Sequence, residues 1–241
     1  MRPTRSTIAA LSACAVLAGC SSAPVDSAAP VVRIQEAVKP SPSRALDQVL
    51  PTVNELATIL GTTGFTGQLV KGGPEMLLQG VRESEATPID CVSAGYRLEK
   101  VVYQASPVQA VASQSWIGGD QNGPSYSGFF GAVKFSTADD AQAFLAASAD
   151  KWHRCNGQTL VLHQPEHGAD GLSRITDVTV DDKTVSAVVL HDNGSTIQRA
   201  LGVAADCVVD VEVTNPPGNS GAGAAGAVGV ANLMLQKIGV S

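Results

Sequence analysis

One stretch of the chain has a clear helical period of hydrophobic residues. From Ser136 to Cys155, apolar residues recur every three or four positions and form one face, on which Ser148 is a small polar residue. The apolar positions are Ala141, Phe144, Leu145 and Trp152. Ser136 and Thr137 are typical helix caps, and the acidic residues after them suit the positive end of the helix dipole. The pattern predicts an amphipathic helix that packs on a sheet and ends in a cysteine.

Strand-like segments stand on both sides of this helix. They are short runs of β-branched, small and aromatic residues between turn signals. The segments are 110–117, 127–135, 159–163, 173–180, 184–190, 195–204 and 208–213. Asp181-Asp182 and the run from His191 to Gly194 are turns of the kind that join antiparallel strands. The second half of the chain therefore reads as a meander.

The ends of the domain read as helical. Residues 43–50 predict a short helical turn, and Pro51 with the Thr52-x-x-Glu55 capping box opens a second helix that stops at Gly61. A small-residue helix begins near Ser220, and its later half, 231–238, carries the apolar positions.

The middle of the chain is harder to assign. Residues 62–89 contain five glycines and two prolines and predict a loop, with one helical turn at 75–78. Residues 94–103 fit a strand or a short helix, and their periodicity does not decide between the two. The predicted fold class is α+β: an antiparallel sheet of about five to seven strands, with helices packed mainly on one face, in a single domain.

The first twenty residues have the features of a bacterial export signal. Arg2 and Arg5 give a positive start, and residues 8–17 are apolar but too few to span a bilayer. Leu17-Ala18-Gly19-Cys20 resembles the lipobox of lipoprotein signal peptides. That resemblance implies cleavage before Cys20 and a diacylglyceryl group on its thiol. An ordinary secretory signal with an incidental cysteine is the alternative.

The export signal sets the predicted domain organisation. Residues 1–19 form the signal peptide, and residues 20–42 form a lipidated cysteine and a flexible tether of small, polar and proline residues. Residues 43–241 form the folded domain, which is long enough to bury a sizeable core. The expected location is the cell membrane, lipid-anchored on its extracytoplasmic face. The membrane is thus a partner through the Cys20 lipid.

The net charge of the chain argues against two kinds of electrostatic partner. The net charge is −6 and no cluster of Lys or Arg occurs, which argues against nucleic acid and against an electrostatic grip on anionic lipid.

Five cysteines occur, and the signal and the lipid account for Cys14 and Cys20. Cys91, Cys155 and Cys207 remain in the exported domain. Pairing is expected in that compartment, so one of the three is left over.

The sequence contains no convincing catalytic, metal or cofactor site. The segment from His163 to His167 has metal-like content, but Pro165 between the histidines favours a surface loop over a zinc site. The run from Gly218 to Gly229 lacks the Lys-Ser/Thr of a phosphate loop. We therefore predict no catalytic residue, no metal ligand and no cofactor.

Several blocks of the sequence resemble a known family. The block from Phe135 to Phe144, continued by Trp152 and Cys155, is the most specific, and Gln198-Arg199-Ala200-Leu201 followed by Val208-Val209-Asp210-Val211 is the second. With Cys91 and the first and last helices, they resemble the PknH-like extracellular sensor domains of mycobacterial kinases. The likeness is closer to the stand-alone lipoproteins that carry the same domain, and it covers residues 46 to the C-terminus.

The resemblance implies a disulfide and a ligand cleft. Cys91 and Cys155 match the family's bridge, whereas Ile197 and the Val213-Thr214 region stand where members commonly have a second pair. Cys207 is then a free thiol in a strand pattern, which favours a buried small hydrophobe. The family cleft suits a small or envelope-derived ligand, whose identity the resemblance does not supply.

Aromatic residues supply the candidates for that cleft. Core packing is the ordinary use of each, but Trp116 and Tyr126 flank a Gly-rich loop and are the predicted rim. The leading hypothesis is a non-catalytic, lipid-anchored sensor or ligand-binding lipoprotein of the cell envelope. An envelope hydrolase and an interaction module for another envelope protein are the alternatives.

Overall fold

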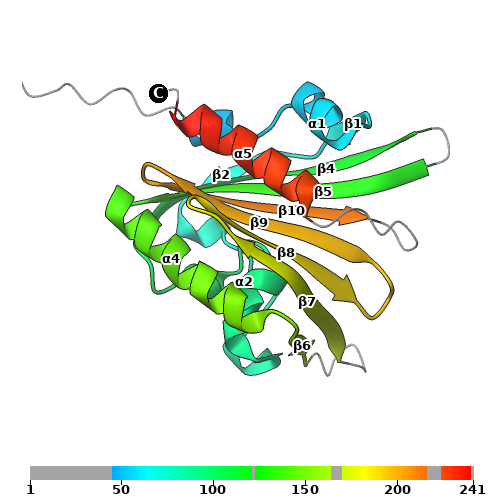
Figure 1. Cartoon of the computed structure of the whole chain (residues 1–241). Coiled ribbons are helices and arrows are strands. Elements are labelled where there is room, and N and C mark those ends of the chain that lie inside the picture. Colours follow the sequence, from blue (N-terminus) through cyan, green and yellow to red (C-terminus); the bar gives the residue numbers. More distant parts are fainter. Residues whose placement is uncertain (1–44, 121–122, 164–169, 216–223, 240–241) are drawn as a thin grey trace, which may run out of the picture. The chain divides into compact units, whose positions relative to one another are not determined.

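The computed structural model describes residues 45–120, 123–163, 170–215 and 224–239, which lie in one compact unit. Within these residues, ten strands form one antiparallel sheet in the order β1-β4-β5-β10-β9-β8-β7-β6-β3, and β2 pairs with β4 beside β1 (Figure 1). The strands are β1 (Gly64–Thr66), β2 (Val70–Gly72), β3 (Ala86–Thr87), β4 (Val108–Asp120), β5 (Gly123–Phe135), β6 (Thr159–Leu162), β7 (Gly171–Val180), β8 (Thr184–His191), β9 (Thr196–Ala204) and β10 (Cys207–Asn215).

Helices cover both faces of the sheet (Figure 1). The helices are α1 (Val53–Leu60), α2 (Val92–Gly95), α3 (Lys100–Tyr103), α4 (Ala138–Cys155) and α5 (Ala225–Gly239), with short 3₁₀ turns η1 (Leu46–Val49), η2 (Pro74–Met76), η3 (Glu83–Glu85) and η4 (Ile89–Cys91). One face carries α4 with α2 and η4, and the other carries α5 with α1 and η1. The prediction of helices mainly on one face is therefore wrong.

The alternation along β10 explains why the sequence does not predict helices on both faces of the sheet. Val209, Val211 and Val213 belong to the core under α5. Asp210 and Glu212 point to the opposite face, and such an apolar-polar alternation is typical of a strand with one face in water. In the structure both acids are buried beneath the α2–α3 segment, because arginines neutralise them there.

Seven of the strands were expected from the sequence, and three were not. β4 to β10 match the seven predicted segments within a few residues at each end. β1, β2 and β3 lie in residues 62–89, the stretch expected to be a loop, and they have only two or three residues each. The sheet is consequently larger than the five to seven strands predicted.

Local signals placed the helices well. The Thr52–Glu55 capping box forms, and Gly61 ends α1 with a left-handed φ of 71°. Thr137 caps α4, and the buried residues of that helix include the whole predicted apolar face and Ser148. Residues 94–103, whose pattern fits a strand or a short helix, fold into parts of α2 and α3, which have four residues each.

Several predicted features lie outside the described residues. They are the signal peptide with Cys20, the tether, the histidine at position 167, and positions 218–223, where the glycine-rich run and the last helix were expected to begin. In the part of the chain that the structure describes, no helix combines the length and apolarity needed to cross a membrane.

Candidate functional site

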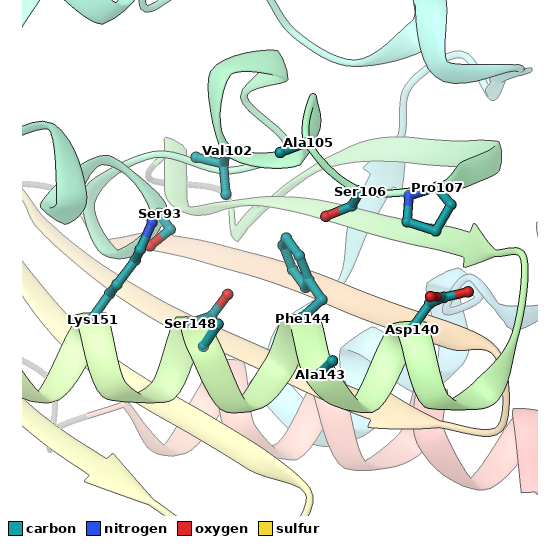
Figure 2. A pocket seen from close by; sticks show the side chains of 11 residues that line it. Ser93, Val102, Ala105, Ser106, Pro107, Asp140, Ala143, Phe144, Ser148 and Lys151 are labelled. Atoms are coloured by element: carbon teal, nitrogen blue, oxygen red, sulfur yellow. The ribbon is translucent and has the colours of Figure 1, made fainter.

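A groove runs along the side of α4, between this helix and the segment from α2 to residue 107 (Figure 2). Its volume is about 370 Å³. From α4 it is lined by Asp140, Ala143, Phe144, Ala147, Ser148 and Lys151. The opposite wall consists of Ser93, Val102, Ala105, Ser106 and Pro107. We call these residues the α4 groove, and its volume falls in the range of small-molecule sites.

The spacing of residues on α4 creates the groove. Asp140, Phe144, Ser148 and Lys151 recur every three or four positions, so they form one stripe along the helix. Ala143 and Ala147 lie beside that stripe and are too small to fill the space in front of them. The middle of the groove is therefore apolar and open.

The two ends of the groove carry opposite charges. Lys151 lies at one end, where its Nζ is 3.2 Å from Asp90 Oδ1. Asp140 lies at the other end, where its Oδ2 accepts a hydrogen bond of 2.6 Å from the Thr137 hydroxyl. Asp140 and Lys151 are eleven positions apart, about 16 Å along an α-helix. The groove thus presents a cation and an anion on either side of an apolar middle.

The wall of the groove continues into the core. The Phe144 ring stacks on Tyr103, with ring centroids 4.6 Å apart, and packs against Phe135 at 5.2 Å. The Ser93 hydroxyl accepts a hydrogen bond of 3.0 Å from Trp152 Nε1. Groove residues from both walls are therefore held by buried aromatic side chains.

A buried ion pair fixes the α2–α3 segment on the sheet. Arg199, which is fully buried, pairs with Asp210 across a distance of 2.9 Å. Its guanidinium also donates to the main-chain carbonyls of Ser93, Ala94 and Tyr96. Because these carbonyls belong to α2 and the residue after it, the arginine anchors one wall of the groove.

Asp210 receives two further hydrogen bonds from the same segment. The Leu98 amide and the Tyr103 hydroxyl donate to Asp210 Oδ2 over 2.8 and 3.0 Å. Burial, and then the neighbouring Asp210 carboxylate, raise the pKa of Tyr103 well above its ordinary value, so the phenol stays protonated and remains a donor. Since Tyr103 also stacks on Phe144, the ion-pair network extends to the centre of the groove.

A second ion pair lies farther along the same face. Arg97 pairs with Glu212 at 2.5 Å, and its guanidinium lies 4.0 Å over the Phe129 ring. These two contacts join the chain between α2 and α3 to β10 and β5. The short helices thus keep their place through side-chain contacts with strands more than thirty residues away in sequence.

The predicted disulfide is present and joins the two walls. Cys91 and Cys155 are bonded, which ties η4 to the last residue of α4. Cys207 is a free, buried thiol, as expected. Burial raises the pKa of the Cys207 thiol to about 12, so it stays protonated in the folded protein.

The predicted rim residue Trp116 is in the core, so that part of the cleft prediction is wrong. Its side chain is fully buried in the cluster under α5. The glycines around it have a packing role: a Cβ on Gly64 or Gly118 would come within 2.5 Å of the indole. The ring therefore lies directly on the backbone of β1 and β4. Glycines beside a tryptophan are also typical of a loop at a cleft, so the sequence alone could not distinguish the two arrangements.

Tyr126 is half-buried at the margin of the same cluster. Neither Trp116 nor Tyr126 lines the α4 groove. The sequence reading missed Asp140, Ser148 and Lys151 as site residues, although the polar stripe they form on the apolar side of the helix was a usable signal.

Another polar pair, Ser173 and His191, brings together a hydroxyl and an imidazole, the two groups that form a serine nucleophile and its base. The Ser173 hydroxyl lies 3.0 Å from His191 Nδ1, but Ser173 is fully buried. Burial lowers the pKa of His191, and a buried hydroxyl is closed to a substrate. Within the described residues, no group of three or more His, Cys, Asp or Glu side chains is arranged to hold a metal ion.

Comparison with known proteins gives one consistent relationship. Residues 41–237 match the family model described as the PknH-like extracellular domain. The serine/threonine-protein kinases PknH of Mycobacterium bovis and Mycobacterium tuberculosis are each 26% identical over 189 residues, which cover 75% of this chain. The chain spans only 30% and 29% of the length of these kinases.

The fold is also similar to a solved structure. The crystal structure of the extracellular domain of PknH from Mycobacterium tuberculosis matches with a TM-score of 0.67 and 23% identity, over 84% of this chain and 99% of that one. At this identity the match establishes the fold alone. The family model covers most of the chain, and the chain therefore belongs to the PknH-like extracellular domain family.

Proposed function

We propose that this protein is a non-catalytic sensor module of the cell envelope, which binds a small amphipathic ligand in the α4 groove and is held at the membrane by a lipid on Cys20. Membership in a family of extracellular domains supports the location. The observation that carries the binding proposal is the groove itself, with an apolar middle between two charged ends.

The lining residues favour binding over bond cleavage. The Ser93 hydroxyl accepts the Trp152 indole hydrogen bond, and Lys151 lies beside the Asp90 carboxylate. A nucleophilic serine needs a base within hydrogen-bond reach, and neither contact supplies one. The small apolar residues of α4 instead offer a surface for a hydrocarbon portion of a ligand.

The charged ends define the class of ligand. Lys151 suits an acidic group, and Asp140 suits a basic or hydroxyl group, as far as about 16 Å away along the helix. Ser93, Ser106 and Ser148 add hydroxyls along the walls. An elongated molecule with an apolar middle and polar ends fits this order of side chains.

Native mass spectrometry of the protein purified from membranes tests the groove. We expect the parent to retain a small molecule and Ala147→Trp to lose it, because the indole fills the apolar middle. Ala146→Trp is the matched control, since Ala146 is exposed on α4 and does not line the groove. Equal retention in both variants, or none in the parent, would contradict the proposal.

Membrane fractionation tests the anchor separately. Cys20→Ala is expected to release the protein from membranes or to leave its signal peptide uncleaved, because a diacylglyceryl group supplies the two chains that stable anchoring needs. Cys14→Ala removes a thiol within the predicted signal and should change neither. A processed Cys20→Ala protein that still sediments with membranes would refute lipid anchoring.

A further inference from the structure

Four large apolar side chains are exposed where β1 and β2 flank β4. Phe65 is 83% exposed, Ile117 56%, Val70 40% and Leu69 36%. Phe65 and Ile117 are paired across β1 and β4, so their side chains are neighbours on one face. Val70 pairs with Ser113, which is on the same face of β4 as Ile117, whereas Leu69 lines a hollow on the other face. We call Phe65, Ile117 and Val70 the edge patch. Apolar side chains gathered on an exposed sheet edge mark a surface that meets another apolar phase.

The described chain begins at the same edge of the sheet, on its other face. Asp47, in η1, is 3.0 Å from Lys71, which pairs with Ala112 of the core under α5. Asp47 and Leu69 also line a shallow hollow on that face. The segment between Cys20 and Ala45 is short, and a flexible chain of that length has a root-mean-square span of about 27 Å. A lipid on Cys20 would therefore keep the edge patch close to the bilayer.

The charge around the patch suits a membrane surface. The chain has a net charge of −6, yet residues 61–73, which include β1 and β2, contain no acid and one base, Lys71. The neighbours of Ile117 from 113 to 119 are uncharged. Anionic headgroups would repel most of an acidic protein, but β1 and β2 contain no carboxylate, β4 has one only at its end, Asp120, and Lys71 offsets the nearby Asp47.

We propose that the edge patch rests on the bilayer that holds the Cys20 lipid, with Phe65 and Ile117 inserted at the boundary between headgroups and acyl chains. This inference rests on the lipid anchor proposed above. The anchor supplies the affinity, and the patch determines which side of the domain faces the membrane. Exposed aromatic and aliphatic side chains are the residues that enter this boundary region in peripheral proteins.

The test uses the mature lipidated protein in vesicles of phosphatidylcholine and phosphatidylglycerol with brominated acyl chains. Phe65→Trp adds an indole to the patch, while the native Trp116 and Trp152 are fully buried. We expect the bromines to quench most of the added emission and the emission to shift to the blue. Ile117→Trp gives a second reading of the same surface.

Leu172→Trp is the matched control. Leu172 is 42% exposed on β7, which lies in the opposite half of the strand order. Its added emission is expected to remain unquenched. Equal quenching at all three positions, or none at the patch, would overturn the inference.

Two further outcomes separate this inference from its alternatives. A shift of the Phe65→Trp emission that depends on protein concentration without lipid would assign the patch to a second copy of the chain and overturn the membrane contact. Flotation of the parent with vesicles measures the anchor by itself. Flotation without quenching refutes the patch alone, whereas failure to float refutes the anchor.

Discussion

Asp210 has properties that its sequence context did not suggest. It stands in an alternating strand pattern, yet it is buried and contacts Arg199, Tyr103 and the Leu98 amide. The neighbouring strand places Leu201 opposite Asp210 in the sheet, with the arginine two residues away on the same face. Such a diagonal pair cannot be read from either strand separately.

Removal of one partner of this ion pair should be costly. We expect Asp210→Ala to lower the free energy of unfolding by about 3 to 5 kcal/mol, because Arg199 would remain buried without its counter-charge. Chemical denaturation measures the loss. The double variant Asp210→Ala with Arg199→Met should recover part of it, and Arg82→Ala, at an exposed pair, should change little. A greater loss in the double variant would contradict this reading of the pair.

Glu99 gives the domain a predictable pH dependence. It is 5% exposed, and burial raises the pKa of its carboxyl although the Val81 amide donates to it. Because its pKa is raised in the folded state, the Glu99 carboxyl contributes its full stabilisation below about pH 4.5. This contribution diminishes as the pH rises through the folded-state pKa. Glu99→Gln, which cannot ionise, removes this loss.

We therefore expect the free energy of unfolding of Glu99→Gln, relative to that of the parent, to increase as the pH rises from 4.5 to 7. This holds whether the variant is more or less stable than the parent at pH 4.5. Denaturation midpoints measured across that range test the sign. Parallel curves for the two proteins would show that Glu99 does not titrate as its surroundings predict.

Element lengths decided what could be predicted. The 18-residue helix α4 and strands of eight or more residues repeat their period often enough to be recognised. Strands of two or three residues, such as β3 (Ala86–Thr87), have no period to detect, and four-residue helices are indistinguishable from strands by pattern. The predictable part of the groove was thus its α4 wall, and the opposite wall was not.

α4 combines a core face with the groove stripe at Phe144. Phe144→Ala should cost about 3 to 5 kcal/mol, because a buried ring that contacts Tyr103 and Phe135 is replaced by a cavity. Gln142→Ala, on the exposed side of the same helix, should leave thermal unfolding almost unchanged. Similar losses in the two variants would mean that the helix does not pack as described.

The Cys91–Cys155 bridge closes a loop with a sequence separation of 64 residues. In the chain-entropy account, its removal should lower stability by about 4 kcal/mol. The double variant Cys91→Ala with Cys155→Ala is expected to show this loss and to become insensitive to reductant, whereas the parent loses a similar amount on reduction. Retention of full stability after reduction would show that the surrounding contacts already hold the two walls.

The whole molecule is a sheet between two helical layers, each with its own core. Sequence patterns identified most of the helices and strands but not the face of the sheet on which each helix packs. That face depends on partners elsewhere in the chain. The α5 layer joins the two ends of the described chain: Lys237 Nζ donates to the Leu50 carbonyl over 2.9 Å and lies 2.6 Å from Glu55 Oε2. The α4 layer carries the groove.

The position of β10 has a consequence for biogenesis. β10 is the last strand of the described residues, yet it lies between β5 and β9 and pairs with both. Until residues 207–215 have emerged, β4–β5 and β6–β9 share no strand pairing, although α4 contacts both, and the core under α5 lacks its final helix. If the chain crosses a membrane from its N-terminus, as the proposed export implies, the sheet can be completed only after β10 has emerged, and β5 and β9 each keep an open edge until then.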